Sequence, residues 1–325
     1  MPIDIAQLSE AELIDIQRRI VGQLPLSRRL VEPEFLFRYR SLSSNRSRED
    51  VERILAHRQI RFSSPAWFND PFDCKVPSSH DVSDATLEAW LRARCWREIG
   101  SEIEENSGFL AENPPDFDTR VAQRYDALWP NHHRIVNADV AVFQQYFNNC
   151  GVLSLTERCD DILLWSHYAD GHQGVCLCFQ RDALNFPQDP DLKSPKQNVF
   201  QPPEKMSYSG SYPTASFVSS PPWEWYRAWM LTKSAHWCYE REWRVILQPK
   251  KGPGWKDTVE TLTVTRHGWQ SLPAHALIGV ILGCSVTPEN ERTVREWLGF
   301  IDAKVLLLRA RKKPERFELE IVDAD

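Results

Sequence analysis

Short apolar and aromatic segments of β-strand length occur along this chain without a regular alternation with helices. A regular alternation would predict a doubly wound parallel sheet, so its absence favours an α+β fold. We therefore expect a central mixed or antiparallel sheet with flanking helices. The predicted strands are residues 35–40, 59–63, 151–155, 174–179, 237–247, 276–283, 305–308 and 317–321.

Two parts of the chain have helical character and lie outside this strand pattern. Residues 4–24 place apolar side chains at helical spacing after Ser9 and Glu12, which match an N-terminal capping box. Residues 81–148 are rich in helix formers, and their first half is acidic. We predict a helical N-terminal segment over residues 1–30 and a single α+β domain over residues 31–325, with a helical insertion at about 81–148. Further helices are predicted at 47–57, 160–169, 223–233 and 287–299, and a long loop rich in Pro, Ser and Gln at 186–222.

Charge and hydropathy exclude several classes of partner. Lys and Arg total 39 and Asp and Glu total 45, a net charge of -6, so the chain lacks a basic coat for long nucleic acid, although a local basic cleft is compatible with it. The sequence has no run of about 18 apolar residues that would predict a membrane-spanning helix. Its start lacks the basic and apolar regions of a secretory signal, and the eight cysteines form no Cys-x-x-Cys pair. We therefore expect a cytoplasmic protein with reduced thiols and no membrane partner.

Four clusters mix aromatic side chains with charged or amide groups. Such mixtures suit a site that stacks flat rings and holds phosphate or ribose hydroxyls. The sequence has no Gly-x-Ser-x-Gly elbow, phosphate loop or dinucleotide fingerprint that would indicate a better-known site. The clusters are residues 38–40, 68–73, 165–174 and 239–244.

Glu240 and Glu242 are the candidate catalytic residues. On the predicted strand 237–247, both carboxylates would point to one face, with Arg241 opposite. Two such carboxylates repel each other, so the pKa of one tends to rise unless a cation lies close. That geometry suits a site that orients a ribose hydroxyl or stabilises a positively charged sugar transition state. The alternative is an exposed strand face with ordinary surface acids, although the flanking aromatic residues argue against full solvation.

The two middle clusters each allow more than one interpretation. His167, Asp170 and His172 could bind a metal, but Gly171 ends the predicted helix between the two histidines. Positioning of a ligand by residues at the helix end, or a purely structural role, are the alternatives.

In residues 69–71, Asn-Asp-Pro predicts a turn, because proline disfavours helix at the residue before it. The functional interpretation of that turn is a wall or lid of the site.

In this order, the clusters resemble the bacterial family catalogued as domain of unknown function 2971. The resemblance spans residues 35–320, and the name of the family carries no function. The matching segments are Phe-Arg-Tyr-Arg-Ser at 37–41, Phe-Asn-Asp-Pro-Phe-Asp at 68–73, Trp-Ser-His-Tyr-Ala-Asp at 165–170 with Gly-Val at 174–175, Tyr-Glu-Arg-Glu-Trp-Arg at 239–244 and the strand at 278–283.

The layout also resembles ADP-ribosyltransferase folds, including those of toxins that modify nucleic acid. This resemblance implies that NAD is the substrate, that Arg38 or Tyr39 holds it and that Tyr168 stacks on the nicotinamide. It also implies that Glu242 is catalytic, with Glu240 assisting or exchanging roles with it. No metal is expected. The residues predicted to bind NAD are Arg38, Tyr39, Arg40, Asn69, Asp70, Trp165, His167, Tyr168 and Arg244.

Three hypotheses about function follow. The first is an NAD-dependent mono-ADP-ribosyltransferase, acting as a toxin or phage-defence effector on an unknown protein or nucleic-acid acceptor. The second is a metal-dependent hydrolase or nuclease that uses the histidines of the third cluster. Its predicted ligands are His167, Asp170 and His172 with Asp70 or Asp73. The third is a non-enzymatic module that senses a nucleotide.

Overall fold

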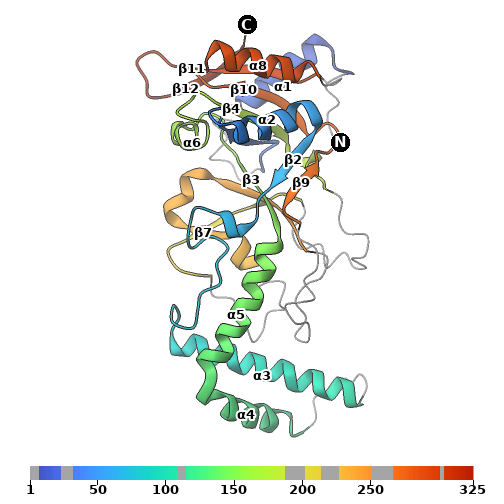
Figure 1. The fold of residues 1–325 in the computed structure, drawn as a ribbon, viewed down its shortest axis with the longest axis vertical. Helices are drawn as coiled ribbons and strands as arrows, with labels where there is room; N and C mark the ends of the chain where they lie inside the picture. Colours follow the sequence, from blue (N-terminus) through green and yellow to red (C-terminus); the bar gives the residue numbers. More distant parts are fainter. Residues whose placement is uncertain are drawn as a thin grey trace.

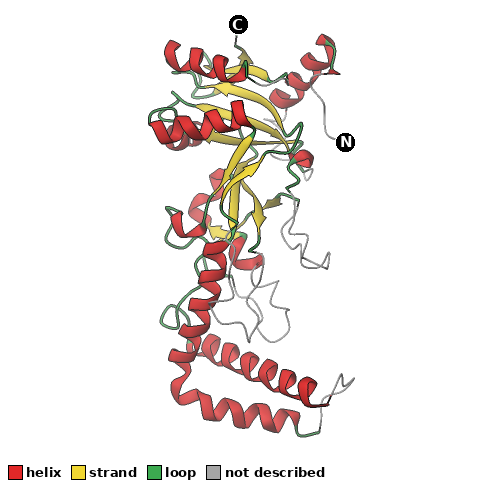
Figure 2. Ribbon diagram, turned by 45° about the vertical axis from the view of Figure 1, so that its right-hand side comes forward, coloured by secondary structure: helices red, strands yellow, loops and turns green. Residues whose placement is uncertain are grey.

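The computed structural model describes residues 7–22, 32–107, 115–186, 202–213, 227–249, 266–300 and 304–324. Their centre is a mixed sheet in the order β12-β11-β10-β4-β1-β3-β8-β5, in which β10 and β11 are parallel and the other neighbours antiparallel. Helices flank this sheet, so the predicted α+β class and mixed sheet are confirmed (Figures 1 and 2). The strands are β1 (Phe35–Arg40), β3 (Gly151–Thr156), β4 (Val175–Gln180), β5 (Glu204–Lys205), β8 (Glu242–Leu247), β10 (Leu277–Leu282), β11 (Leu306–Lys312) and β12 (Leu319–Asp323).

The central strands are buried on both faces, which explains why they appear in the sequence as nearly continuous apolar runs. One face packs against helices α2 (Asn45–His57) and α8 (Pro288–Leu298). The other face packs against α1 (Glu10–Gly22) and α6 (Ile162–Tyr168). In α1 the predicted capping box is present, since the Ser9 amide donates to the Glu12 carboxylate over 2.8 Å.

Two short ladders extend the central sheet. Strand β2 (Gln59–Phe62) pairs with β9 (Gly268–Ser271) in antiparallel fashion, and Ser63, directly after β2, forms a bridge with Val152 of β3. Strand β6 (Ser207–Ser209) pairs with β7 (Thr232–Ser234) in parallel. Strand β3 therefore links the large sheet to the β2–β9 ladder.

Three long helices occupy the part of the chain where a helical insertion is predicted. They are α3 (Asp84–Ser107), α4 (Phe117–Leu128) and α5 (His132–Asn149). In Figure 1, α3 and α4 lie at the far end of the molecule from α8, and α5 runs back from them to β3. A second core joins this arm to the sheet, with Trp90, Phe143, Trp229 and Ile246 among its buried side chains. The division into domains stays a prediction.

Several local predictions are wrong. The strand predicted over 237–247 begins only at Glu242, the first residue of β8. The residues before it form a 3₁₀ helix over Ala235–Glu240, and Arg241 between the two has a left-handed φ of 45°. The predicted loop 186–222 contains β5 and β6, while residues 187–201 and 214–222 lie outside the described residues. The predicted helix 223–233 is confirmed only in part: residues 223–226 lie outside the described residues, residues 227–230 are helical, and the last two residues belong to β7. Of the helices in the described ranges, none is long and apolar enough to cross a membrane.

Candidate functional site

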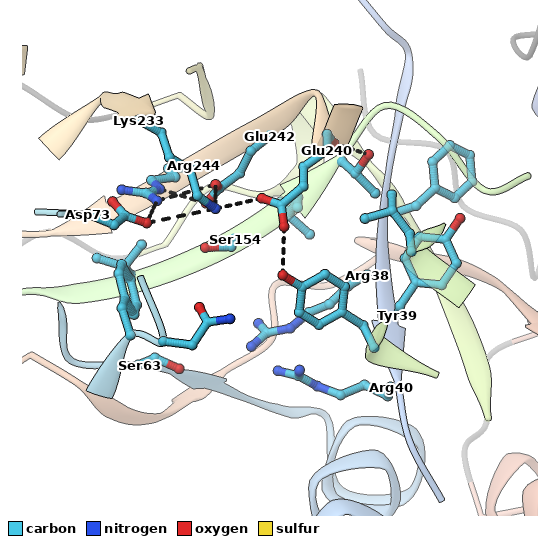
Figure 3. Close-up of a pocket in the computed structure, with 18 residues that line it drawn as sticks. Arg38, Tyr39, Arg40, Ser63, Asp73, Ser154, Lys233, Glu240, Glu242 and Arg244 are labelled. Atoms are coloured by element: carbon cyan, nitrogen blue, oxygen red, sulfur yellow. Dashed lines mark hydrogen bonds and ion pairs between the residues drawn. The ribbon is translucent and has the colours of Figure 1, made fainter. Parts of the chain in front are cut away.

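A pocket opens where β1 and β3 separate. Within the described residues these neighbouring strands share one residue pair, Phe37 with Thr156, whereas β1 and β4 are paired over all six residues. Beyond that pair, β3 takes Ser63 as its partner instead of β1. The resulting gap holds a cavity of about 210 Å³, bordered by β1, β3, β8, α6 and the loop at residues 68–73 (Figure 3).

Lys233 lies at the centre of a buried ionic cluster on one side of this pocket. Its Nζ is 2.6 Å from Glu240 Oε2, 3.0 Å from Glu242 Oε2 and 3.8 Å from Asp73 Oδ2. The side chain is 8% exposed, so these interactions operate away from bulk water. Burial alone would lower the pKa of Lys233, but Glu242, Glu240 and Asp73 outweigh it and raise that pKa, which keeps the amine charged.

Arg244 is the second cation of the cluster and is 1% exposed. Its Nη2 is 2.6 Å from Asp73 Oδ2 and its Nε is 2.6 Å from Glu242 Oε1, while its Nη1 donates to the Met230 carbonyl over 2.9 Å. Burial would raise the pKa of Glu242, but Arg244 and Lys233 prevail and lower it to about 2. The cluster therefore combines three carboxylates with two cations.

Tyr168, at the end of α6, also contacts this ionic cluster. Its hydroxyl donates to Glu240 Oε1 over 2.6 Å. Burial and the Glu240 carboxylate raise the pKa of Tyr168, so the phenol keeps its proton and remains a donor. The helix is fixed at its start by Asp161, whose Oδ1 accepts from the amides of Leu163 and Leu164 at 2.9 and 3.2 Å.

Arg38 and Arg40 supply positive charge on the other side of the pocket. Figure 3 shows both guanidinium groups pointing into it, facing Glu240. Arg38 donates to the Arg61 carbonyl over 3.2 Å, and burial, Arg40 and Arg61 lower its pKa against the opposing effect of Asp50. Among the described residues, neither guanidinium forms an ion pair with a carboxylate, and the buried Nε of Arg40 has no hydrogen-bond partner. Two neighbouring guanidinium groups that form no ion pair, one buried and one half-buried, are suited to bind an anion.

Most of the predicted site residues meet at this pocket. The loop at 68–73 contributes Asn69 and Asp73, which supports its interpretation as a wall of the site. The shared face of Glu240 and Glu242 has a different cause from the predicted strand: the left-handed Arg241 turns the chain between them, and Lys233 holds both carboxylates. Besides Tyr39, the predicted residues that border the pocket are Arg38, Arg40, Asn69, Tyr168, Glu240, Glu242 and Arg244.

Four predicted ligand-binding residues have other positions. Tyr39 borders the cavity through its strand, but its ring packs edge-on against Trp165 at 5.0 Å and its hydroxyl donates to the Arg158 carbonyl over 3.0 Å. Trp165 is fully buried in the core behind the pocket. Asp70 is buried in its turn, where Oδ1 accepts from the amide two residues on over 2.9 Å. His167 is exposed on α6 and does not border the pocket.

The predicted metal ligands do not converge. His172 lies in a left-handed turn with Asp170 and Gly171, and its ring stacks at 6.2 Å on Trp165, whereas His167 is exposed. Over the parts of the chain that the structure describes, no group of three or more His, Cys, Asp or Glu side chains is arranged to hold a metal ion.

Sequence reasoning missed Lys233 and Tyr208. Tyr208, on β6, accepts a hydrogen bond from the Glu242 amide over 2.7 Å, and Lys233 lies on the partner strand β7. Nothing near either residue in the sequence marks it, because both reach the cluster through a parallel pairing between segments more than twenty residues apart.

One comparison with known proteins gives a match. The model of a family described as a protein of unknown function (DUF2971) matches residues 164–245, which confirms the suspected resemblance to this family over that segment. The segment contains Tyr168, Lys233, Glu240, Glu242 and Arg244. No curated protein and no solved structure matches the chain.

Proposed function

We propose that this chain is an NAD-dependent mono-ADP-ribosyltransferase whose active site is the pocket between β1 and β3. The observation that carries the proposal is the placement of Arg38 and Arg40, whose guanidinium groups form no ion pair among the described residues, across one cavity from the buried pair Glu240 and Glu242. A dinucleotide needs both features, because its diphosphate is anionic and its reacting ribose becomes cationic.

The reaction breaks the bond between the ribose carbon C1 and the nicotinamide nitrogen. Nicotinamide leaves with the electron pair and becomes neutral, and the ribose develops oxocarbenium character. A carboxylate close to the sugar stabilises this charge and orients the ribose hydroxyls. An acceptor nucleophile then forms the new bond to C1 and releases its proton, so that ADP-ribose is transferred. A protein or a nucleic acid is the proposed acceptor, and a role as a toxin or phage-defence effector stays a prediction.

We assign the sugar-facing role to Glu240. Both oxygens of Glu242 are engaged by Arg244, and one of them also by Lys233, so that Glu242 mainly orders the cluster. Among the described residues, each oxygen of Glu240 has one hydrogen-bond partner, Tyr168 for Oε1 and Lys233 for Oε2, and can accept a second hydrogen bond. Tyr168 is therefore proposed to position Glu240, in place of the nicotinamide stacking that the resemblance implies.

The size of the cavity limits which part of NAD it encloses. Pockets that enclose a whole drug-sized ligand measure roughly 300–1,000 Å³, and this one has about 210 Å³. The proposal therefore places the nicotinamide ribose inside, with the phosphate attached to that ribose at Arg38 and Arg40. The adenylate half would lie beyond the cavity.

Incubation of the protein with labelled NAD and a cell lysate tests the proposal. We expect the wild type to transfer label and to release nicotinamide, and Glu240→Gln to be about 10²–10³-fold slower. Glu88→Gln, at a half-exposed glutamate of α3 that does not border the pocket, is the matched control and should have the activity of the wild type. Absence of label transfer and of NAD loss in the wild type, or an unimpaired Glu240→Gln variant that is folded by circular dichroism, would contradict the proposal. NAD binding without turnover would instead favour the nucleotide-sensing hypothesis.

A further inference from the structure

A second cavity lies directly beside the proposed active site. It has a volume of about 210 Å³ and is bordered by β7, by the turn after β6 and by the end of the 68–75 loop. Lys233 borders both cavities, and Phe72 of the second cavity directly precedes Asp73 of the first. The two cavities are therefore neighbours that share one buried lysine.

Aromatic surface is available at this second cavity. Phe72 is 59% exposed although it is a large apolar side chain. Its ring contacts Tyr212 at a centroid distance of 6.2 Å and an interplanar angle of 63°. An exposed aromatic ring of this kind offers a face on which any of the nucleobases can stack.

The charge at the cavity is positive. Lys75 borders it, and its Nζ makes one long hydrogen bond, 3.4 Å to the Pro65 carbonyl. Within the described residues no carboxylate forms an ion pair with Lys75, and no acidic side chain borders the cavity. Asp70 and Asp81 lie near enough to Tyr212 to act on its pKa, but neither borders the cavity.

Small hydroxyl groups complete the lining. Ser209, Ser211, Thr232 and Ser234 all border the cavity. A hydroxyl can donate or accept, so these groups can pair with ribose hydroxyls and phosphate oxygens.

We infer that the second cavity binds a nucleoside monophosphate unit. The base stacks on Phe72 beside Tyr212, Lys75 binds the phosphate and the serine and threonine hydroxyls contact the sugar. This inference deepens the proposed function and rests on it, since a nucleotide held here lies next to the site that would cleave NAD. The same chemistry has two sources: the adenylate half of NAD, which the first cavity is too small to enclose, or a nucleotide of a nucleic-acid acceptor.

Calorimetric titration of the full chain tests the inference with four probes: AMP, nicotinamide riboside, NAD and a single-stranded oligonucleotide. The variants are Phe72→Ala and Lys75→Gln, which change exposed or half-exposed side chains outside the buried cluster. Their matched controls are Phe317→Ala, at a phenylalanine that is 99% exposed, and Lys304→Gln, at an exposed lysine. We expect both test variants to bind AMP about tenfold more weakly than the wild type, and nicotinamide riboside equally well, while the controls bind AMP like the wild type.

The remaining probes separate the two sources. A parallel loss of NAD affinity with unchanged oligonucleotide affinity assigns the cavity to the adenylate half of NAD. A loss of oligonucleotide affinity with unchanged NAD affinity assigns the cavity to the nucleic-acid acceptor. AMP binding that is absent in the wild type, or equal in wild type and both test variants, overturns the inference. Failure of the proposed function has a different signature: no binding of nicotinamide riboside and no cleavage of NAD, with AMP affinity still dependent on Phe72 and Lys75.

Discussion

The buried carboxylate of Glu242 provides a quantitative test of the ionic cluster. Its pKa falls from the ordinary 4.5 to about 2, against the effect of burial, because of Arg244 and Lys233. At 1.36 kcal/mol for each pKa unit, this fall corresponds to about 3 kcal/mol of folding stability at pH 7. We therefore predict that Glu242→Gln, which keeps the shape of the side chain and removes its charge, lowers the free energy of unfolding by about 3 kcal/mol at that pH.

The same reasoning fixes the pH dependence. Because the pKa is lower in the folded state, the stabilisation is complete above pH 4.5 and is lost as the pH falls through 2. At pH 3 the difference between wild type and Glu242→Gln should shrink to roughly half of its value at pH 7 or less. Urea unfolding followed by tryptophan fluorescence between pH 3 and pH 7 measures this difference.

Glu88→Gln is the control for this measurement. Glu88 is half-exposed and pairs with Arg92 over 3.0 Å on the surface of α3, so its loss should cost less than about 1 kcal/mol. The reasoning is refuted if Glu242→Gln is no more destabilising at pH 7 than Glu88→Gln. It is also refuted if the cost of Glu242→Gln does not decrease toward pH 3.

Three further substitutions test other parts of the structure. Arg38→Met replaces a buried guanidinium that has no carboxylate partner among the described residues, so we expect an unchanged or higher Tm by scanning fluorimetry and about a tenfold higher KM for NAD; a lower Tm would contradict this. Tyr168→Phe removes one hydrogen bond to a carboxylate, and we expect about 2 kcal/mol less stability in urea and about tenfold slower NAD cleavage, with a wild-type rate counting against its positioning role. Gly283→Ala would place a methyl group 2.0 Å from the His172 carbonyl oxygen, and we expect it to lower the free energy of unfolding by about 2 kcal/mol or more in urea. Gly210→Ala is the control, since no atom lies within 4 Å of the added methyl group, and it should change stability by less than about 0.5 kcal/mol. Equal effects of the two substitutions would refute the predicted clash.

The strands at the centre of the sheet could be predicted because burial on both faces leaves a local signal. In β4 and β10 nearly every residue is apolar, and β1 is apolar or aromatic apart from its two arginines, a pattern that few other structures of that length require. The two-residue strand β5 and the three-residue strands β6 and β7 give no such signal. Their residues are polar, and their pairing depends on partners distant in the sequence.

The sequence predicted which residues form the candidate site better than it predicted how they are arranged. Aromatic and charged clusters indicated that Arg38, Tyr168 and Glu240 share a function, and they do meet at one pocket. The error over residues 237–241 has a local cause: alternating aromatic and charged residues fit a strand, but Arg241 adopts a left-handed conformation that ends the pattern. Lys233 could not be identified, since a single lysine is unremarkable until the fold places three carboxylates around it.

The seam between β1 and β3 has a mechanical consequence. Five strands lie on one side of it and three on the other, and among the described residues the pairing of Phe37 with Thr156 is what joins them. Arg40 belongs to the first group and Glu240 adjoins the second, so a molecule bound to both would act as a clamp between two half-sheets. We therefore expect local opening motions of the ligand-free protein to be most frequent along the boundary between β1 and β3, where few backbone hydrogen bonds must break. Binding of a ligand in the pocket should suppress these motions.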